Sequence, residues 1–323
     1  MILCIGEAVI DMFQKKVSGL GETFYPLPGG CSYNTSVAIG RLGVPAAFMG
    51  RLSKNFFGEI QIQRLKENNV NCDLVIRCDQ NPILAFIKTE EGSQPQYAFY
   101  DEGTADRPLL TEDIPSLPVN INCVVFGSVS MSMEPIATTI ETLILKEARD
   151  QSEQKKVIAF DPNIRPFMIK DRNAYMNRFE KWAAACTIAK ISSEDFEYIF
   201  PRTEPEEALH KMIGLGTRLA IATLGPQGAI ALLRREDGSV TKESAPGIRA
   251  ANLADTVGAG DTFHGAFLAY LDTKGKLSHN SIANLSETDL RNALTFANKA
   301  AAIVCSRHGA EPPWLEEMLE INH

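Results

Sequence analysis

Short apolar runs alternate with helix-length amphipathic segments along most of this 323-residue chain, and this alternation limits its fold more than any other feature. The apolar runs are residues 2–5, 46–49, 123–126, 157–161, 188–191, 219–223 and 228–233. The segments with helical spacing of apolar residues are 33–42, 58–68, 135–149, 175–186, 204–213, 262–271 and 289–304. Such alternation is typical of a parallel sheet covered by helices. We therefore predict one α/β domain over residues 1–323, with a mainly parallel central sheet and helices on both faces.

Two β-rich segments interrupt the alternation. Residues 83–89 and 97–100 have the composition of a β-hairpin around a Glu-Gly-Ser turn, and residues 13–28 carry aromatic residues among glycines and prolines. No internal repeat or low-complexity linker separates these segments from the rest of the chain. We predict that about 13–28 and 83–105 form a small β-sheet lid on the single domain.

Charge and cysteine content exclude several classes of function. The chain has 32 Lys and Arg against 40 Asp and Glu, a formal net charge of −8, so its overall charge gives no affinity for nucleic acid. The seven cysteines include no CxxC pair and no zinc-like spacing, which favours a reducing compartment. No secretory signal opens the chain and no apolar run is long enough to cross a membrane. We expect a cytoplasmic protein without a nucleic-acid or membrane partner.

Residues 255–263 read DTVGAGDTF and lead directly into a helical pattern. Small residues at Gly258, Ala259 and Gly260 leave the N–H groups of a helix start uncovered, where they bind anions. Asp261 is close enough to such an anion to take part in chemistry, although it is also a candidate first-turn cap. A Gly-x-Gly turn alone is equally typical of a plain turn.

A second polar pattern lies near the start of the chain. Paired glycines, Gly29 and Gly30, allow a close approach of the backbone to a ligand, and Asn34 offers both a donor and an acceptor. The alternative for Asn34 is a helix N-cap. Asp11 follows the first apolar run, where a carboxylate is either a ligand or a solvated turn residue.

Three further strand ends carry polar residues. Arg165 in Asp161-Pro162-Asn163-Ile164-Arg165 is suited to a phosphate, or else is an exposed residue of a rigid loop. Glu194 and Asp195 follow the run 188–191, and Thr223, Gly225 and Gly228 form a turn after 219–223. His264 has the neighbours of a packed helical residue and not of a base.

Together these motifs resemble the signatures of the ribokinase-like sugar kinases, also called the PfkB carbohydrate kinase family. The resemblance runs from Gly6 to about Gly309, nearly the whole chain. It implies ATP-dependent phosphorylation of a sugar hydroxyl, with Asp261 as general base and Gly258, Ala259 and Gly260 as the anion hole. Phosphoryl transfer has a loose transition state, so positioning and charge provide most of the catalysis, and Arg165 would add positive charge.

The resemblance also implies roles for residues that spacing alone does not assign. The substrate-binding residues would be Asp11, Gly29, Gly30, Asn34, Phe99 and Asp106, and the nucleotide-binding residues would be Thr223, Gly225, Gly228 and Asn298. Relatives carry an Asn-x-x-Glu motif for Mg²⁺ where this chain has Ser192 and Asp195. We expect Asp195 to bind Mg²⁺ through water, and Glu194 is the alternative candidate. Asp255 and Val257 would border a monovalent-cation site, with K⁺ as the candidate ion. Lids of relatives often pair between subunits, so a homodimer is expected.

Within the family the chain is most similar to the fructokinases, by residues 6–8, 161–165 and 100–106. D-fructose is therefore the expected substrate, with ribose, 2-keto-3-deoxygluconate or a nucleoside as alternatives. A non-catalytic sugar-binding regulator would have lost Asp261 or its glycines, and all are present. A dinucleotide-dependent oxidoreductase needs GxGxxG after the first strand, where this chain has Glu7-Ala8-Val9. Neither a Walker loop nor a protein-kinase motif occurs.

Overall fold

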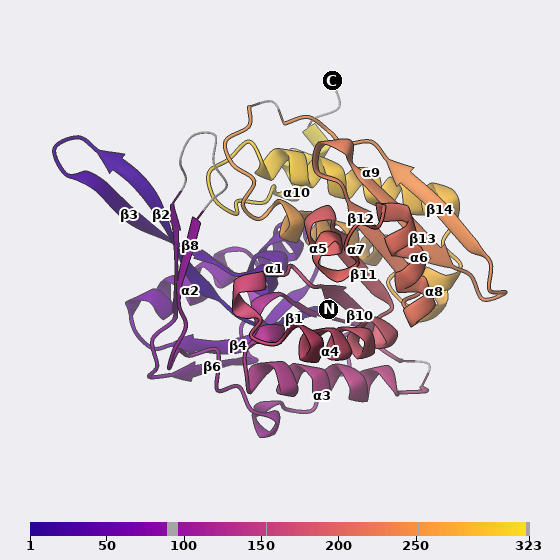
Figure 1. The fold of residues 1–323 in the computed structure, drawn as a ribbon, viewed down its shortest axis with the longest axis horizontal. Coiled ribbons are helices and arrows are strands. Elements are labelled where there is room, and N and C mark those ends of the chain that lie inside the picture. Colours follow the sequence, from indigo (N-terminus) through magenta and orange to yellow (C-terminus); the bar gives the residue numbers. More distant parts are fainter. Residues whose placement is uncertain (89–95, 153, 251, 321–323) are drawn as a thin grey trace.

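A ten-stranded sheet crosses the middle of the computed structural model, which describes residues 1–88, 96–152, 154–250 and 252–320 (Figure 1). Along the sheet the order is β14-β13-β12-β11-β10-β9-β1-β4-β5, and β6 pairs with β4. The strands are β1 (Ile2–Ile5), β4 (Ala46–Ser53), β5 (Val70–Asn71), β6 (Val75–Cys78), β9 (Cys123–Gly127), β10 (Val157–Asp161), β11 (Ile188–Ser192), β12 (Leu219–Thr223), β13 (Ala229–Arg234) and β14 (Val240–Ala245). All pairs from β5 to β12 are parallel, and β13 and β14 are antiparallel additions at one edge.

Both faces of the sheet are buried, which explains why the parallel strands are continuously apolar. Ile2 and Cys4 of β1 pack into one hydrophobic core and Leu3 and Ile5 into the other, because successive side chains point to opposite faces. The first face is covered by α1 (Cys31–Arg41), α2 (Phe56–Glu67), α7 (Ala259–Thr273), α8 (His279–Ala283), α9 (Glu287–Val304) and α10 (Leu315–Glu320). The second is covered by α3 (Ile136–Ala148), α4 (Arg172–Ala185), α5 (Ser193–Ile199) and α6 (Pro205–Leu215).

A separate four-stranded sheet stands at one side of the molecule (Figure 1). Its order is β3-β2-β7-β8, from β2 (Val9–Val17), β3 (Gly21–Gly29), β7 (Ile83–Lys88) and β8 (Gln96–Tyr100). The two β-rich segments of the sequence therefore pair with each other, through the parallel ladder of β2 and β7. The first begins at Val9, four residues before the predicted boundary, and residues 89–95 of the second lie outside the described residues.

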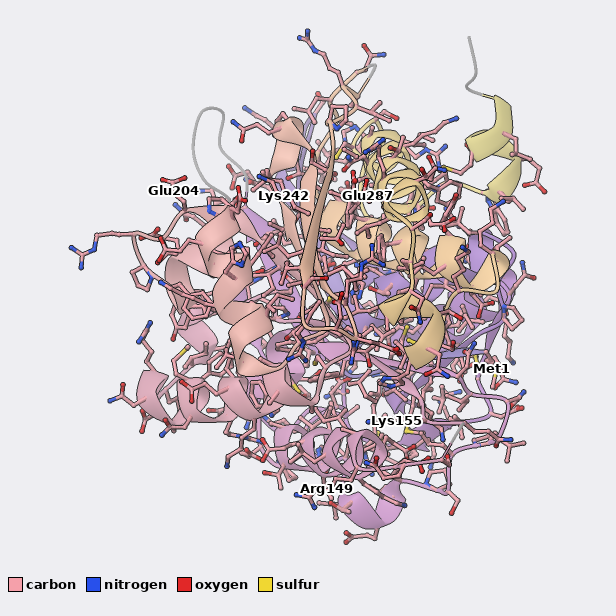
Figure 2. All side chains as sticks on the ribbon, turned by 90° about the vertical axis from the view of Figure 1, so that its right-hand side faces the viewer. Met1, Arg149, Lys155, Glu204, Lys242 and Glu287 are labelled. Carbon is pink, nitrogen blue, oxygen red and sulfur yellow. The ribbon has the colours of Figure 1, made fainter. Side chains whose placement is uncertain are left out.

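The predicted fold class is confirmed: a mainly parallel sheet between two layers of helices, with a second small sheet. The sequence pattern did not predict the edge strand β14, because its composition is polar. Lys242 is exposed on the face shown in Figure 2, and Glu243 pairs with Arg291 of α9. In the described part of the chain, no helix combines the length and the hydropathy needed to cross a membrane.

Candidate active site

A cavity of about 990 Å³ lies between the carboxyl ends of the parallel strands and the small sheet. Ser128, Asn163, Ser193 and Thr223, at or just beyond the ends of β9 to β12, line one wall. The opposite wall consists of side chains on one face of the small sheet: Asp11, Phe13, Tyr25, Ile87 and Phe99. Ligands of open parallel sheets bind at the carboxyl ends of the strands, so this is the expected place for a site.

The glycine-rich turn lies at the floor of this cavity. Gly258 has a left-handed backbone (φ 73°) that lets the chain enter α7, and a Cβ on Gly258 would lie 2.5 Å from the Cβ of Ala310. Gly258, Ala259, Gly260 and Asp261 all line the cavity. The N–H of Ala259 donates to the carbonyl of Thr256 (3.2 Å), so the remaining N–H groups of the first turn are the ones available to an anion.

Asp261 lies in the first turn of α7, and 6% of the residue is exposed. Its Oδ2 accepts a hydrogen bond from Asn34 Nδ2 (2.9 Å), and its Oδ1 accepts one from Asn163 Nδ2 (3.5 Å). Burial raises the pKa of Asp261 to about 6, with a further contribution from the negative charge of Asp161. Asn34 is not a helix N-cap, because α1 begins at Cys31 and Gly30 takes the cap position.

Asp11 faces Asp261 from the small sheet. A Cβ on Gly29 would lie 1.9 Å from Asp11 Oδ2, so only glycine at position 29 leaves room for this carboxylate. Burial and the charge of Asp261 raise the pKa of Asp11 to about 7, while Arg165 acts against them. Gly30 has φ 107° and passes against the backbone of Glu7. Gly29 itself lies behind Asp11 and does not line the cavity.

Glu7 holds the start of α1 in place, a role that the sequence did not indicate. Its carboxylate accepts hydrogen bonds from the Cys31 N–H (3.1 Å), the Ser130 N–H (3.2 Å) and the Ser130 hydroxyl. Burial raises its pKa. Glu7 thereby joins the end of β1, the segment after β9 and the glycine pair Gly29 and Gly30.

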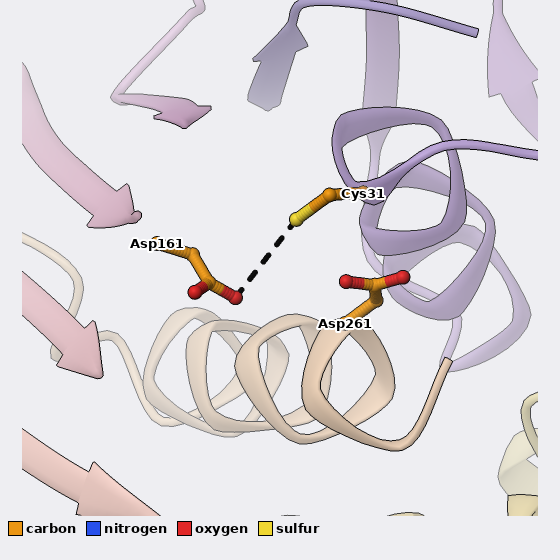
Figure 3. Close-up of side chains that lie close together, drawn as sticks. All are labelled: Cys31, Asp161 and Asp261. Carbon is orange, nitrogen blue, oxygen red and sulfur yellow. Dashed lines mark hydrogen bonds between the residues drawn. The ribbon is translucent and has the colours of Figure 1, made fainter. Parts of the chain in front are cut away.

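Lys190, Asp161 and Cys31 form a buried polar cluster beside Asp261, and none was predicted as a site residue. Lys190 Nζ donates to Asp161 Oδ2 (3.0 Å), and the Cys31 thiol donates to the same oxygen with an S···O distance of 3.9 Å (Figure 3). Figure 3 shows the side chains of Cys31, Asp161 and Asp261 converging from α1, β10 and α7, respectively. His264 is fully buried nearby, as its apolar neighbours indicated, and burial lowers its pKa to about 3.

The remaining predicted sugar-binding residues are divided between the lining and the layer behind it. Phe99 lines the cavity, and its ring lies 5.4 Å from that of Phe167 in the segment after β10. Asp106 is buried behind the lining, where its Oδ1 accepts a hydrogen bond from the Ala8 N–H (2.9 Å). Among the described residues its Oδ2 has no partner, and burial raises its pKa to about 8.

The nucleotide-binding candidates line the far end of the cavity. Thr223 ends β12, and Gly225 (φ 55°) and Gly228 (φ 96°) shape the turn that follows. Asn298 on α9 also lines the cavity, but its Nδ2 donates to the carbonyls of Ala245 (3.1 Å) and Pro246 (3.0 Å). Arg165 lines the cavity near Asp11, with Nη1 bonded to Asn163 Oδ1 (2.7 Å).

The candidate cation ligands differ in their exposure and in the hydrogen bonds that they already accept from the protein. Asp195 accepts hydrogen bonds from the Ile164 N–H (2.7 Å) and the Ser192 hydroxyl (2.7 Å), so each of its oxygens already has a donor. Glu194 is exposed at the cavity wall. Asp255 accepts hydrogen bonds from the N–H groups of Val257 (2.7 Å) and Gly309 (2.8 Å), and therefore fixes the loop beside the glycine-rich turn.

Comparison with known proteins gives a consistent result. Residues 1–317 match the model of the pfkB family carbohydrate kinases. A fructokinase of Rhizobium leguminosarum bv. trifolii is 37% identical over 293 residues, which cover 90% of this chain and 86% of that protein. The crystal structure of a fructokinase with bound ATP from Xylella fastidiosa superposes with a TM-score of 0.86 at 23% identity, covering 98% and 96% of the two chains. An uncharacterized sugar kinase from Pyrococcus horikoshii superposes with a TM-score of 0.81 at 26% identity, covering 99% and 97%. This chain belongs to the pfkB family of carbohydrate kinases and is an ATP-dependent sugar kinase.

Proposed function

We propose that the sugar is D-fructose and that Asp261 is the general base of the transfer. The observation that carries this proposal is the position of Asp261 between the glycine-rich turn and Asp11, in one cavity. A sugar that hydrogen-bonds to Asp11 and Asn34 would present a hydroxyl to the Asp261 carboxylate. The similarity to the Rhizobium fructokinase supports fructose as that sugar.

In this mechanism the protein positions two substrates and supplies charge. Asp261 accepts the proton of the sugar hydroxyl, and Asn34 holds the carboxylate toward the cavity through its hydrogen bond to Oδ2. The N–H groups of the first turn of α7 bind the transferring phosphoryl group, together with Gly258, Gly260 and Arg165. ATP would lie along the wall that carries Thr223, Gly225, Gly228 and Asn298.

We propose Mg²⁺ as the companion of ATP, near Glu194 and Asp195. Glu194 is the better direct candidate, because both Asp195 oxygens accept hydrogen bonds from the protein. Mg²⁺ would neutralise phosphate charge there. A K⁺ site beside Asp255 and Val257 is a further part of the proposal. A double mutant of a Vibrio cholerae fructokinase, 22% identical to this chain, was solved with fructose, ADP and a potassium ion. The fructokinase of that organism, 23% identical, was also solved with fructose, ADP and a calcium ion.

The small sheet is proposed to act as a lid. Phe99 on β8 contacts Phe167 beyond β10, so this pair bridges the small sheet and the main domain at the mouth of the cavity. A closed lid would exclude water, which otherwise competes as phosphoryl acceptor. Phe99→Ala should therefore raise ATP hydrolysis in the absence of sugar relative to sugar-dependent turnover. An unchanged ratio would contradict the lid.

We also propose a homodimer formed through the outer face of this sheet. That face carries Phe24, Phe86 and Tyr100, whose rings contact each other in sequence at 5.1 and 5.5 Å, and Tyr100 is 64% exposed. Exposed apolar clusters of this kind are typical of interaction surfaces. Sedimentation of the wild type against Phe86→Glu tests the assignment, and a monomeric wild type would contradict it.

The proposed location is the cytoplasm, and the proposed partners are limited to sugar, ATP and a second copy of the chain. All seven cysteines are free thiols, which supports a reducing compartment. Ribose, 2-keto-3-deoxygluconate and nucleosides remain the alternative substrates. A non-catalytic regulator is less well supported, because Asp261 and both glycines of the turn are present in the site.

The deciding experiment is coupled ADP release with Mg-ATP against D-fructose, D-ribose, 2-keto-3-deoxygluconate, D-glucose and adenosine. We expect kcat/KM for fructose to exceed the others by about tenfold or more, a difference of about 1.4 kcal/mol in transition-state binding. Preferred turnover of another member would keep the kinase and overturn fructose. Binding of ATP without turnover of any member would favour the regulator.

A further inference from the structure

Lys190 is the only lysine or arginine that is buried in the part of the chain that the structure describes, and 3% of it is exposed. It lies in the middle of β11, between the apolar residues Ala189 and Ile191. Phe160 of β10 pairs with Ala189 of β11, so the next residues of the two parallel strands, Asp161 and Lys190, lie side by side. Their side chains form an ion pair with an N···O distance of 3.0 Å, and 1% of the Asp161 side chain and 4% of the Lys190 side chain are exposed.

The ammonium group lies directly against the glycine-rich turn. A Cβ on Gly260 would be 2.9 Å from Lys190 Nζ, and Lys190 itself lines the cavity. Because Gly260 has no side chain, there is room for an anion on the cavity side of the turn and for the Lys190 ammonium on its other side. The peptide N–H groups and the ammonium contribute positive charge to the same point.

A purely structural role does not account for this arrangement well. Burying an ion pair costs desolvation that the attraction between the charges only just repays, and apolar residues in its place are often equally stable. The charged and titratable groups around this point are mostly acidic. They are Asp161, Asp261, Asp11, Asp195, Glu7, Cys31 and His264, with Arg165 as the second cation. Positive charge is therefore scarce where an anionic phosphoryl group would arrive.

We propose that Lys190, held in place by Asp161, supplies fixed positive charge beneath the phosphoryl-binding turn and keeps Asp261 ionised while phosphate is bound. The inference rests on the proposed roles of Asp261 and the glycine-rich turn. In this arrangement Asp161 is a positioning residue: it fixes the ammonium and compensates its charge before the substrates bind. The charge of Lys190 also lowers the pKa of Asp261, opposing the effects of burial and of Asp161.

The test compares Lys190→Met with Lys156→Met, a matched control at the opposite end of β10. Lys156 forms a similar partly buried ion pair with Glu147, at 3.0 Å and with exposed fractions of 14% and 11%. Loss of one preorganised charge contact typically lowers kcat by about 10²–10³. We expect that loss for Lys190→Met, with sugar KM within about threefold of the wild type, and near-normal kcat for Lys156→Met. A near-normal kcat for Lys190→Met would overturn the proposal.

A double variant separates charge from folding. Lys190→Met leaves the buried Asp161 carboxylate without its ion-pair partner, which itself destabilises the protein. Lys190→Met combined with Asp161→Asn removes both charges, so its Tm should return toward that of the wild type. We expect its kcat to remain low, because the charge beneath the turn is still missing. Recovery of kcat together with Tm would show that the pair is only structural.

A binding measurement tests the charge without any turnover. A cation at the phosphoryl position should favour the non-hydrolysable analogue AMP-PNP over ADP. In the double variant, the Kd of AMP-PNP divided by the Kd of ADP should therefore rise by about tenfold or more. An unchanged ratio would overturn the proposal even if no sugar in the panel is phosphorylated. Conversely, if wild-type turnover is lost in Asp261→Asn while Lys190→Met is near normal, the proposed function stands and only this inference fails.

Discussion

Asn34 and Asp261 are 227 residues apart in the sequence, and the Asn34 amide donates a 2.9 Å hydrogen bond to the Asp261 carboxylate. The bond joins the first helix to the helix that follows the glycine-rich turn, and it leaves Asn34 Oδ1 without a partner among the described residues. One amide can therefore orient the base and receive a hydroxyl donor from the substrate. The two ends of the sequence form one site through this contact.

Asp261→Asn should lower kcat at least ~10²-fold, because the amide has no basic oxygen for the proton of the hydroxyl. Sugar affinity, measured by isothermal titration calorimetry, should stay close to that of the wild type, since the amide keeps the size and one acceptor of the carboxylate. Near-normal turnover in this variant would remove Asp261 from the role of base.

The pH dependence of kcat/KM should show an acid limb near pH 6. Asp261 must be ionised to accept a proton, and burial raises its pKa to about 6, so kcat/KM falls as the pH drops through that value. The hydrogen bond from Asn34 lowers this pKa, so Asn34→Ala should move the limb to higher pH. Initial rates over about pH 5–8 give both midpoints. A limb that stays in place in Asn34→Ala would contradict the assignment of the limb to Asp261.

Gly29→Ala should weaken sugar binding more than it lowers kcat. The new methyl group would lie 1.9 Å from Asp11 Oδ2, so the carboxylate must move out of its place on the cavity wall. We expect KM for the sugar to rise at least about tenfold. The matched control is Gly214→Ala, a helical position where nothing lies within 4 Å of the added Cβ, which should leave KM unchanged. Equal KM values in the two variants would exclude Asp11 from sugar binding.

Asp11→Asn should stabilise the protein without ligands at neutral to alkaline pH. The pKa of Asp11 rises from 3.8 to about 7 on folding, so the folded protein binds the extra proton between these values and loses stability as the pH rises through them. The amide carries no such cost. The Tm gain over the wild type should therefore be several degrees at about pH 8 and should nearly vanish at about pH 4. A gain of the same size at both pH values would contradict the buried-charge explanation.

We expect the loop that contains Ala310 and Glu311 to support turnover through its contacts with α1, α2 and the glycine-rich turn. Glu311 forms ion pairs with Arg41 of α1 (2.7 Å) and with Arg64 of α2, and the preceding residue, Ala310, packs against Gly258. Glu311→Gln removes one charge from this network, so we expect a lower Tm and a kcat reduced several-fold with unchanged sugar KM. Differential scanning fluorimetry and initial rates check both effects, and a normal kcat despite a lower Tm would limit the network to stability.

Much of the fold was predictable because burial on both faces of a parallel sheet leaves a plain signal of apolar runs. The edge strand β14 lacked that signal, because its outer side faces solvent and its residues are largely polar. The glycine-rich turn and Asp261 were recognisable as a continuous motif. Lys190 and Asp161 were not, because their meaning depends on the pairing of two strands and on the empty position at Gly260. Asp106 was expected to contact the sugar, but it lies one layer behind the lining, which only the tertiary structure reveals.

The small sheet places alternate residues of β2 on opposite faces, with Asp11 and Phe13 toward the cavity and Met12 away from it. A one-residue insertion or deletion within the strand would exchange the two faces. A substitution in this sheet therefore changes one side chain, whereas a change in strand length changes which side chains face the cavity along the whole strand. Over evolutionary time, insertions and deletions should accumulate at the turn of residues 18–20 between β2 and β3, where they leave the alternation intact.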